Sequence, residues 1–287
     1  MSGARFLTKF AFAALVIVAT AIGGFSLDQA KAETGKSVAG FAGDLHVDDG
    51  GEGGVPVVFI HSFAGDISHW AAQLEHLRKT RRAVAIDARG HGKSDAPKDG
   101  DYLVDSQAND IAAVADALKL ERFVLVGHSM GGSSAIAYAS AHPDRVAGLV
   151  LAGAAGKLPD EEAKKIVGAL QANFTKVYDE YWNKLLTGAR PAVRDRLNQG
   201  KKTIPDDAAL TIIKAIFAYD PVAAPKTYPG PKLAIVTPSA DTPTDLHHLV
   251  EGLPHLLIKG TSHWMQMDKP DEFNRILDEF LSQKIEK

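Results

Sequence analysis

The chain has 287 residues, of which 45% are hydrophobic and 23% charged, a composition typical of a globular protein with a sizeable core. The net charge is −3 and lysine and arginine do not cluster, which argues against nucleic acid or an anionic membrane surface as a partner. Cysteine is absent, so disulfides, cysteine nucleophiles and thiolate metal sites are excluded. The expected partner is therefore a small molecule.

The N-terminal segment differs from the rest of the chain. Arg5 and Lys9 precede an apolar run at residues 10–22, and an Ala-Lys-Ala sequence at residues 30–32 fits the small-residue pattern of a cleavage site. The apolar run is shorter than the roughly 20 residues that a membrane-spanning helix needs. We therefore expect residues 1–32 to be a signal peptide, removed on export to the periplasm or beyond. The alternative is an uncleaved N-terminal membrane anchor.

After this segment, short apolar runs alternate with longer segments of helical period, a pattern that predicts a parallel sheet with helices on its faces. An edge hairpin is expected first, at residues 37–47. Four apolar runs predict buried strands, because each is partly β-branched or aromatic and too short for a helix: residues 57–60, 83–86, 123–126 and 146–151. Helices are expected between them, at residues 68–78, 104–118 and 133–141.

Residues 156–225 break this alternation. They show apolar residues at helical spacing and no convincing strand, so we expect a helical cap inserted into a core made of residues 33–155 and 226–287. The core pattern then resumes with a strand at residues 232–236, a helix at 244–250, a strand at 255–258 and a closing helix at 271–285. The predicted fold class is α/β, with a mostly parallel central β-sheet flanked by helices.

One short motif indicates the chemistry. Residues 127–131 read Gly-His-Ser-Met-Gly and fit the G-x-S-x-G pattern, in which the chain turns sharply from a strand into a helix and exposes a serine. An apolar run leads into Gly127 and small residues follow, as the turn requires. The motif therefore predicts Ser129 as a nucleophile, whereas His128, at the variable position, is expected to have no direct role.

On these residues the chain resembles the α/β-hydrolase family, in its serine-nucleophile, esterase-like branch, from about Val55 to the C-terminus with the exception of the cap. Residues 87–94 read Asp-Ala-Arg-Gly-His-Gly-Lys-Ser and look like the family's D-x-R-G-x-G-x-S segment. We interpret that segment as structural, with Asp87 and Arg89 paired to hold loops together.

The resemblance also implies the partners of the serine. A serine hydroxyl needs a neutral imidazole to take its proton and a carboxylate to orient that imidazole, and in this family they follow in the order serine, acid, histidine. His263 stands where the family places its base, between the last strand and the final helix. Asp241, shortly after the strand at residues 232–236, fits best as the acid. Pro238 replaces a glycine usual in relatives, so Asp245 and Asp220 stay open as alternatives.

The family's oxyanion donors correspond here to the backbone N–H groups of Phe63 and Met130. The loop at residues 61–65 resembles the family's H-G-x-x-G segment, but Ser62 replaces the first glycine. Its backbone is expected to be strained, or its hydroxyl to supply an extra polar contact. His61 is expected to be a buried structural hydrogen-bonding group.

Two aromatic residues and a pair of histidines complete the candidates. Trp70 and Trp264 flank loops near the expected cleft and are candidates to contact substrate, although large aromatic residues fill cores as often. His247 and His248 are expected to face apart on a helix, and no H-x-H or H-E-x-x-H spacing occurs, so we expect no metal and no cofactor.

These features predict a serine hydrolase that cleaves carboxylic esters or lactones of small molecules through an acyl-enzyme on Ser129. Relatives that open epoxides or displace halide carry aspartate at this position, so the serine speaks against both reactions. Two alternatives stay open: hydrolysis of carbon-carbon bonds in ring-fission products, and a ligand-sensing receptor with little turnover. Activity is expected to fall as His263 protonates, at about pH 6 to 7 for an ordinary histidine.

Overall fold

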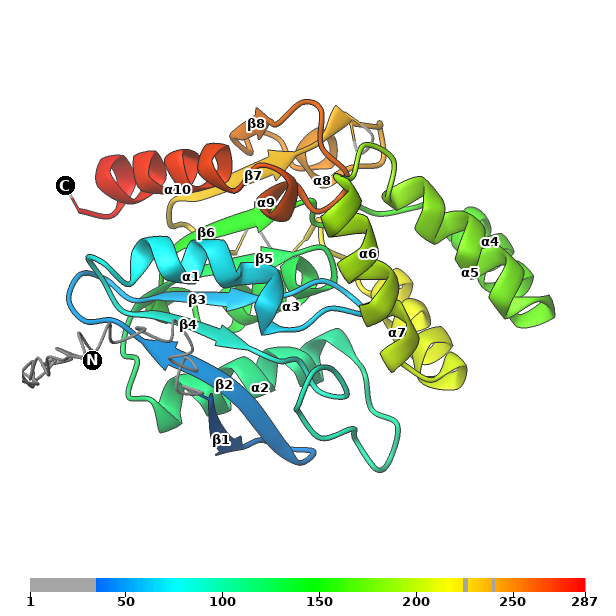
Figure 1. Ribbon diagram of the computed structural model, residues 1–287, viewed down its shortest axis with the longest axis horizontal. Coiled ribbons are helices and arrows are strands. Elements are labelled where there is room, and N and C mark those ends of the chain that lie inside the picture. The colour runs from blue at the N-terminus through cyan, green and yellow to red at the C-terminus, as the bar shows by residue number, and fades with distance from the viewer. Residues whose placement is uncertain (1–34, 224–226, 239–240, 287) are drawn as a thin grey trace, which may run out of the picture. The chain divides into compact units, whose positions relative to one another are not determined.

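The computed structural model describes residues 35–223, 227–238 and 241–286, so the expected signal peptide lies outside the described residues. An eight-stranded sheet in the order β1-β2-β4-β3-β5-β6-β7-β8 forms the centre of the described region (Figure 1). Strand β2 runs antiparallel to β1 and β4, and the other neighbouring pairs are parallel. The strands are β1 (Gly35–Ala39), β2 (Asp44–Gly50), β3 (Val57–Ile60), β4 (Ala83–Ile86), β5 (Phe123–His128), β6 (Val146–Ala152), β7 (Lys232–Val236) and β8 (His255–Leu257). The predicted fold class and the expected edge hairpin are confirmed.

Helices cover both faces of the sheet. Those outside the segment between β6 and β7 are α1 (Ala71–Leu77), α2 (Val104–Ala117), α3 (Met130–Ala141), α8 (Leu246–Leu249), α9 (Met265–Asp268) and α10 (Pro270–Lys284). Apolar side chains of α2 and α3 pack on one face, and those of α1 and α10 pack on the other (Figure 1). No helix in the described ranges is both long and apolar enough to cross a membrane.

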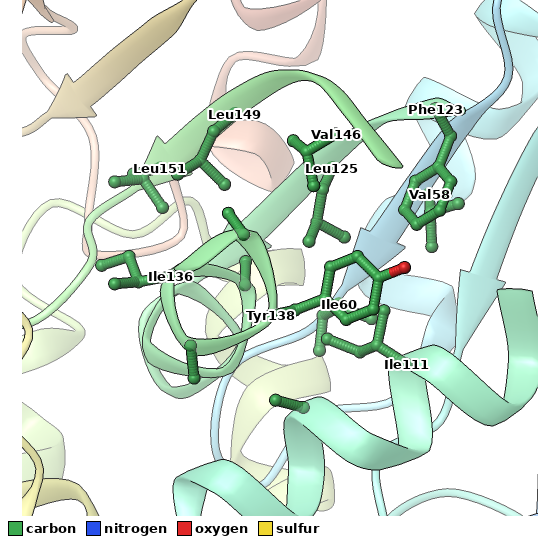
Figure 2. Close-up of a cluster of buried hydrophobic side chains, with 14 of the residues drawn as sticks. Val58, Ile60, Ile111, Phe123, Leu125, Ile136, Tyr138, Val146, Leu149 and Leu151 are labelled. Carbon is green, nitrogen blue, oxygen red and sulfur yellow. The ribbon is translucent and has the colours of Figure 1, made fainter. Parts of the chain in front are cut away.

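The central strands are apolar along nearly their whole length, except for His128 at the end of β5, because both of their faces are buried. In β3, Val58 and Ile60 contact the α2 and α3 side, while Val57 and Phe59 contact the α1 and α10 side. Strand β5 alternates in the same way, since successive side chains of a strand point to opposite faces. Figure 2 shows the first of these two clusters, where strand residues meet Ile111 and other helix side chains.

Between β6 and β7 the described residues form helices and no strand. These helices are α4 (Asp160–Ala172), α5 (Phe174–Leu185), α6 (Pro191–Gly200) and α7 (Asp206–Ala218), and we call them the cap helices. They lie together beyond one end of the sheet (Figure 1). Their apolar side chains form one buried cluster with Met130 and Trp264. The cap helices therefore cover the carboxyl end of β5, where the serine motif begins.

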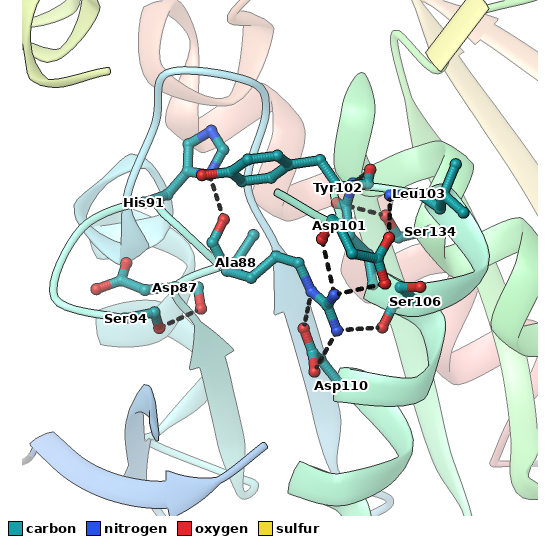
Figure 3. Close-up of polar contacts among 12 residues, drawn as sticks. Asp87, Ala88, His91, Ser94, Asp101, Tyr102, Leu103, Ser106, Asp110 and Ser134 are labelled. Carbon is teal, nitrogen blue, oxygen red and sulfur yellow. Dashed lines mark hydrogen bonds and ion pairs between the residues drawn. The ribbon is translucent and has the colours of Figure 1, made fainter. Parts of the chain in front are cut away.

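The segment at residues 87–94 is structural, but Asp87 and Arg89 do not pair with each other as expected. The Arg89 guanidinium instead makes a two-point ion pair with Asp110 of α2, from Nε to Oδ2 at 2.7 Å and from Nη2 to Oδ1 at 2.9 Å. It also donates to the backbone carbonyls of Asp101 and Ser106, both at 2.8 Å (Figure 3). Arg89 thereby ties the loop before α2 to the helix itself.

Asp87 holds a different set of loops together through hydrogen bonds to its carboxylate. Its carboxylate accepts hydrogen bonds from the backbone N–H groups of Ile67 at 2.7 Å and Lys93 at 2.9 Å, and it contacts Nδ1 of His46 at 2.9 Å. The two charged residues were expected to satisfy each other because they are close in sequence. Each is satisfied by groups from other loops and elements, because buried charges need several hydrogen bonds as well as one opposite charge.

Candidate active site

Ser129 lies at the sharp turn between β5 and α3. Its backbone has φ 52° and ψ −114°, a left-handed conformation that costs a residue with a side chain about 1–3 kcal/mol. The turn is held by hydrogen bonds on both sides: the Ser129 N–H donates to the Ala152 carbonyl of β6 at 3.0 Å, and its own carbonyl accepts from the N–H of Gly132 at 2.8 Å. The strain is thus maintained by the sheet and by the first turn of α3.

The two motif glycines make this turn possible. A Cβ on Gly127 would lie 2.3 Å from the Gly131 carbonyl oxygen, and a Cβ on Gly131 would lie 2.5 Å from the carbonyl oxygen of Ile60 in β3. Both separations are far below a van der Waals contact, and the obstructing atoms are backbone. The spacing of the motif therefore reflects how closely the turn approaches β3 and α3.

The loop between β8 and α9 brings His263 to the residue before the nucleophile. The His263 carbonyl accepts a hydrogen bond from Nε2 of His128 at 3.0 Å, and the two imidazole rings lie 4.8 Å apart. The His263 N–H donates to the Leu185 carbonyl at the end of α5, at 3.1 Å. A Cβ on Gly153, the residue after β6, would lie only 3.1 Å from Cε1 of His263. Core and cap helices together therefore position the candidate base.

Two neighbours that sequence reasoning did not assign hold this loop. His128 donates from Nε2 to His263 and its Nδ1 faces the Gln266 side-chain nitrogen at 3.1 Å, so His128 is a positioning residue rather than a bystander. Asp268 accepts from the Ser262 N–H at 2.8 Å and from the Ser262 hydroxyl at 2.5 Å, and its other oxygen accepts from the N–H of Arg190, the residue before α6, at 2.9 Å. Nothing local in the sequence identifies either role, because both depend on the folded loop.

Burial sets the protonation state of the candidate base. His263 is only 9% exposed, and desolvation lowers the pKa of its imidazole to about 4. The ring is therefore neutral at pH 7, which is the form that can accept a proton from a serine hydroxyl.

Asp241 is not brought to His263. Its carboxylate Oδ1 contacts Nε2 of His247 at 3.1 Å and Nε2 of His248 at 2.7 Å. The alternatives are also engaged elsewhere: Asp245 accepts from the N–H and hydroxyl of Thr242, and Asp220 pairs with Lys157 at 2.5 Å. Among the described residues no carboxylate hydrogen-bonds to the His263 ring, and the structure places that ring 4.8 Å from the ring of His128, the residue before Ser129. The assignment of Asp241 as the acid stays a prediction.

The two expected oxyanion donors are available. The N–H groups of Phe63 and Met130 have no hydrogen-bond acceptor within the described part of the chain. Met130 is the first residue of α3, where N–H groups have no partner inside the helix and the helix dipole favours negative charge.

His61 supports the loop at residues 61–65. It is fully buried, its Nδ1 contacts the Ser62 carbonyl at 2.7 Å and its Nε2 accepts the Ala88 N–H at 3.0 Å. The expected structural role of His61 is confirmed.

Ser62, which replaces a glycine of the family pattern, makes a specific contact. Its hydroxyl accepts a hydrogen bond from the Trp264 indole N–H at 3.0 Å, and both side chains are buried. The expected extra polar contact is confirmed, and it links the loop at residues 61–65, which we call the oxyanion loop, to the residue after the candidate base.

Ser62→Ala should lower the free energy of unfolding by about 1–3 kcal/mol, because the indole N–H would lose its acceptor while staying buried. Urea unfolding followed by fluorescence measures this difference.

The Ser62→Gly variant, which restores the family glycine, should lose the same hydrogen bond and show a similar drop. Unfolding midpoints of both variants within error of the parent chain would mean that the contact does not stabilise the fold. Ser282→Ala, which changes an exposed serine of α10 whose hydroxyl bonds to the Glu279 carbonyl of its own helix, serves as the comparison and should unfold like the parent.

The two tryptophans proposed as substrate contacts belong to different buried clusters, Trp70 to the core and Trp264 to the cluster under the cap helices. Trp70 is fully buried and packs against Phe59 and Phe273 with ring centroids 4.9 and 5.9 Å away, so it fills the core and does not face the cap helices as a substrate contact would. Trp264 lies under the cap, 5.0 Å from the ring of Trp182. Both rings lie near His128, at 6.3 Å for Trp70 and 6.1 Å for Trp264, but of the two only Trp264 belongs to the buried cluster of the cap helices.

The cap helices place aromatic side chains over the loop at residues 61–65. Tyr178 of α5 packs on the ring of Phe63 at 5.9 Å, and its hydroxyl is buried without a hydrogen-bond partner among the described residues. A cavity of about 260 Å³ lies at the opposite, amino-terminal edge of the sheet, lined among others by Pro56, Arg122 and Lys284. It holds none of the candidate catalytic groups, so the serine turn and its cover remain the candidate site.

Comparison with known proteins agrees with this geometry. A model of the α/β hydrolase fold matches residues 55–187. The chain is 36% identical to the 2-hydroxymuconate semialdehyde hydrolase of Pseudomonas sp. (strain CF600) over 151 residues, which are 50% of this chain and 52% of the relative. It is 29% identical to the 2-hydroxy-6-oxononadienedioate/2-hydroxy-6-oxononatrienedioate hydrolase of Paraburkholderia phymatum over 269 residues, 83% of this chain and 91% of the relative.

Solved structures give the same result over more of the fold. The structure of Est816, described as an N-acyl homoserine lactone degrading enzyme, superposes with a TM-score of 0.74 at 26% identity and covers 85% of this chain and 100% of that chain. Some curated relatives are matched over only part of their length, 29%, 52% and 38% in three cases. The chain therefore has the α/β hydrolase fold, and the matched residues 55–187 include the serine turn.

Proposed function

We propose that this protein is a serine hydrolase that cleaves carboxylic esters or lactones of small molecules through an acyl-enzyme on Ser129. The observation that carries the proposal is the strained conformation of Ser129, with φ 52°, next to His128, whose ring lies 4.8 Å from the buried His263 imidazole. The N–H groups of Phe63 and Met130 have no acceptor among the described residues and are available to an oxyanion. Strain of this size persists where function needs an exposed nucleophile. The likeness to a lactone-degrading enzyme supports the same reaction class.

Each group has a role in this proposal. His263 takes the Ser129 hydroxyl proton as the oxygen attacks the carbonyl carbon, and the N–H groups of Phe63 and Met130 stabilise the oxyanion. The protonated imidazole then gives its proton to the departing alcohol oxygen. Water attacks the acyl-enzyme, again losing its proton to His263, and the carboxylic acid and free Ser129 are released. Asp241 remains the proposed acid, and this role requires its carboxylate to leave His247 and His248 and reach the His263 ring.

A second candidate reaction is hydrolysis of a carbon-carbon bond in a ring-fission product. It is favoured by the relative from Paraburkholderia phymatum, which is matched over 91% of its length and named for such a reaction. A dienoate substrate carries a carboxylate, which needs a cationic or hydrogen-bonding partner. We rank ester and lactone hydrolysis first, because the structure of a lactone-degrading enzyme covers 85% of this chain with a TM-score of 0.74.

The deciding experiment combines labelling with a substrate panel. A fluorophosphonate probe should add covalently to one residue, and peptide mass spectrometry should identify it as Ser129. The same protein is then assayed on p-nitrophenyl esters of graded chain length, on lactones and on a ring-fission dienoate. Turnover of esters or lactones supports the proposal, turnover of the dienoate alone supports the second reaction, and a single burst without turnover supports the ligand-receptor alternative.

The pH dependence tests the base. Since protonated His263 cannot accept the serine proton, kcat/KM should fall as the pH drops through the pKa of His263 in the free enzyme. Burial lowers that pKa to about 4, so kcat/KM should stay level from pH 8 to about pH 5 and reach half its value near pH 4. This differs from the pH 6 to 7 expected of an ordinary histidine. If Asp241 reaches the ring when substrate binds, the midpoint for kcat should lie at higher pH.

Intrinsic fluorescence recorded over the same pH range checks that the protein stays folded. A kcat/KM midpoint at pH 6 to 7 would contradict this prediction and would mean that a carboxylate already contacts His263 in the free enzyme.

We also propose that the protein acts after export, on the basis of the charged, apolar and small-residue pattern of residues 1–32.

A further inference from the structure

Two adjacent histidines and the proposed catalytic acid converge at the start of α8. Nε2 of His247 lies 3.1 Å and Nε2 of His248 lies 2.7 Å from the same carboxylate oxygen of Asp241. The two imidazole rings lie against each other with centroids 4.1 Å apart and their planes tilted by 41°. Sequence reasoning expected these histidines to face apart, and that was wrong, because α8 is a single turn and Asp241 lies within reach of both side chains.

We propose that Asp241, His247 and His248 bind one divalent transition-metal ion of the Zn²⁺ class, and that the bound ion competes with His263 for Asp241. The three potential ligand atoms lie within 4.8 Å of one another. Ligands of a tetrahedral zinc ion at about 2.0–2.1 Å are separated by about 3.3 Å, so an ion between these atoms requires only small side-chain rotations.

The donor set selects the kind of ion. Two imidazole nitrogens with one carboxylate oxygen suit zinc, nickel or copper, whereas calcium and magnesium prefer sites built of oxygen. The side chain of His247 is 2% exposed, while those of His248 and Asp241 are 46% and 44% exposed. One ligand is therefore held in place by its buried surroundings, and the open side leaves room for a solvent molecule as fourth ligand.

The charge state of the cluster also suits a cation. An aspartate carboxylate is ionised at neutral pH, and Asp241 presents one of its oxygens to both histidines. Each Nε2 donates a hydrogen bond to the Asp241 carboxylate and therefore carries a proton. An ion can bind Nε2 only after this proton has left: in a neutral ring the proton moves to Nδ1, and a charged ring loses one proton. The ring of His255 packs on His247 at 4.6 Å and restricts its rotation.

Competition for the acid follows from the position of Asp241, and this part rests on the proposed function. One carboxylate cannot ligate an ion at α8 and orient the His263 imidazole at the same time. Occupancy of the site would therefore keep Asp241 away from the base, and the hydrolase would be inhibited reversibly. Removal of the ion by a chelator would free the carboxylate.

Metal binding is tested first, without any assay of activity. Zn²⁺ is titrated into the EDTA-treated and dialysed full-length chain in competition with a chromophoric chelator. We expect one strong site per chain, and its affinity should fall more than about 100-fold in His248→Ala, since loss of second-sphere partners alone weakens metal sites 10–100-fold. His248 is half exposed, so the variant should fold, and circular dichroism checks that it does.

The matched control is His76→Ala. His76 also contacts a carboxylate, that of Asp278 at 2.8 Å, and is similarly half exposed, but it has no second histidine on that oxygen. This variant should bind Zn²⁺ like the parent chain. Equal affinity in the parent, His76→Ala and His248→Ala chains, or no strong binding at all, would overturn the metal site.

Inhibition is tested second. With an ester that the parent chain hydrolyses, Zn²⁺ at the concentration that fills the site should lower kcat at least 10-fold and EDTA should restore it, whereas His248→Ala should need about 100-fold more Zn²⁺. Site-specific binding with unchanged kcat would overturn the competition. A chain without hydrolase activity would refute the proposed function, while the binding titration would still decide the metal site.

Discussion

Replacing Ser129 by alanine should lower kcat on a p-nitrophenyl ester by about 10⁴- to 10⁶-fold, the loss typical when the nucleophile of a serine hydrolase is removed. The Ser62 hydroxyl of the oxyanion loop is not expected to replace it, because it is engaged by the Trp264 indole at 3.0 Å. Steady-state kinetics on the purified variant, with rates corrected for spontaneous hydrolysis, measure the effect. The fold should be retained, because the backbone hydrogen bonds of the turn do not use the hydroxyl.

Two further variants make the result specific. Ser133→Ala changes a buried serine one turn further along α3 and should keep the parent rate. Ser129→Gly should be as inactive as Ser129→Ala yet at least as stable as the parent, because glycine adopts a φ of 52° without the strain of a side chain. Substantial ester turnover by Ser129→Ala, or equal losses in Ser129→Ala and Ser133→Ala, would remove Ser129 from the mechanism.

Replacing Arg89 by methionine should lower the free energy of unfolding by about 3–5 kcal/mol. The change leaves the Asp110 carboxylate, only 4% exposed, as a buried charge without its partner, and it removes the donors for the Asp101 and Ser106 carbonyls. Figure 3 shows these acceptors gathered around the start of α2. Urea unfolding at neutral pH, followed by fluorescence and by circular dichroism, gives the difference.

The comparison is Arg275→Ala, which breaks an exposed pair with Glu279 one turn away on α10 and should cost less than about 0.5 kcal/mol. The double variant Arg89→Met/Asp110→Leu should recover much of the lost stability, since it removes the unpaired charge as well. If Arg89→Met unfolds at the same urea concentration as the parent, the ion pair is not a stabilising contact.

The sequence was most informative where structure depends on local pattern. Strands β3, β4 and β7 begin and end at the predicted residues, and β5 and β6 extend only slightly further. Their positions are readable because a strand buried on both faces must be apolar throughout, and such short runs are distinct from helical spacing. The serine turn was readable for a related reason: Gly127 and Gly131 are required by backbone atoms within a few residues or in the adjacent strand.

Side-chain partners across the fold were less readable. Asp87 and Arg89 are near neighbours in sequence, yet each is satisfied by different loops, and Trp70 lies in the core although it follows the oxyanion loop. Asp241 shows the same difference, because its place after β7 was evident but its contact with His247 and His248 was not.

By itself the sequence therefore determined the α/β sheet and the sharp turn that carries Ser129, since these follow from hydrophobic period and from steric limits within short stretches of chain. Only the tertiary structure decided that His128 holds the His263 loop, that Ser62 bonds to Trp264, and that Asp241 faces two histidines. The physical reason is that a polar side chain bonds to whichever group the packing of distant segments brings within about 3 Å of it, and no local pattern encodes that neighbour.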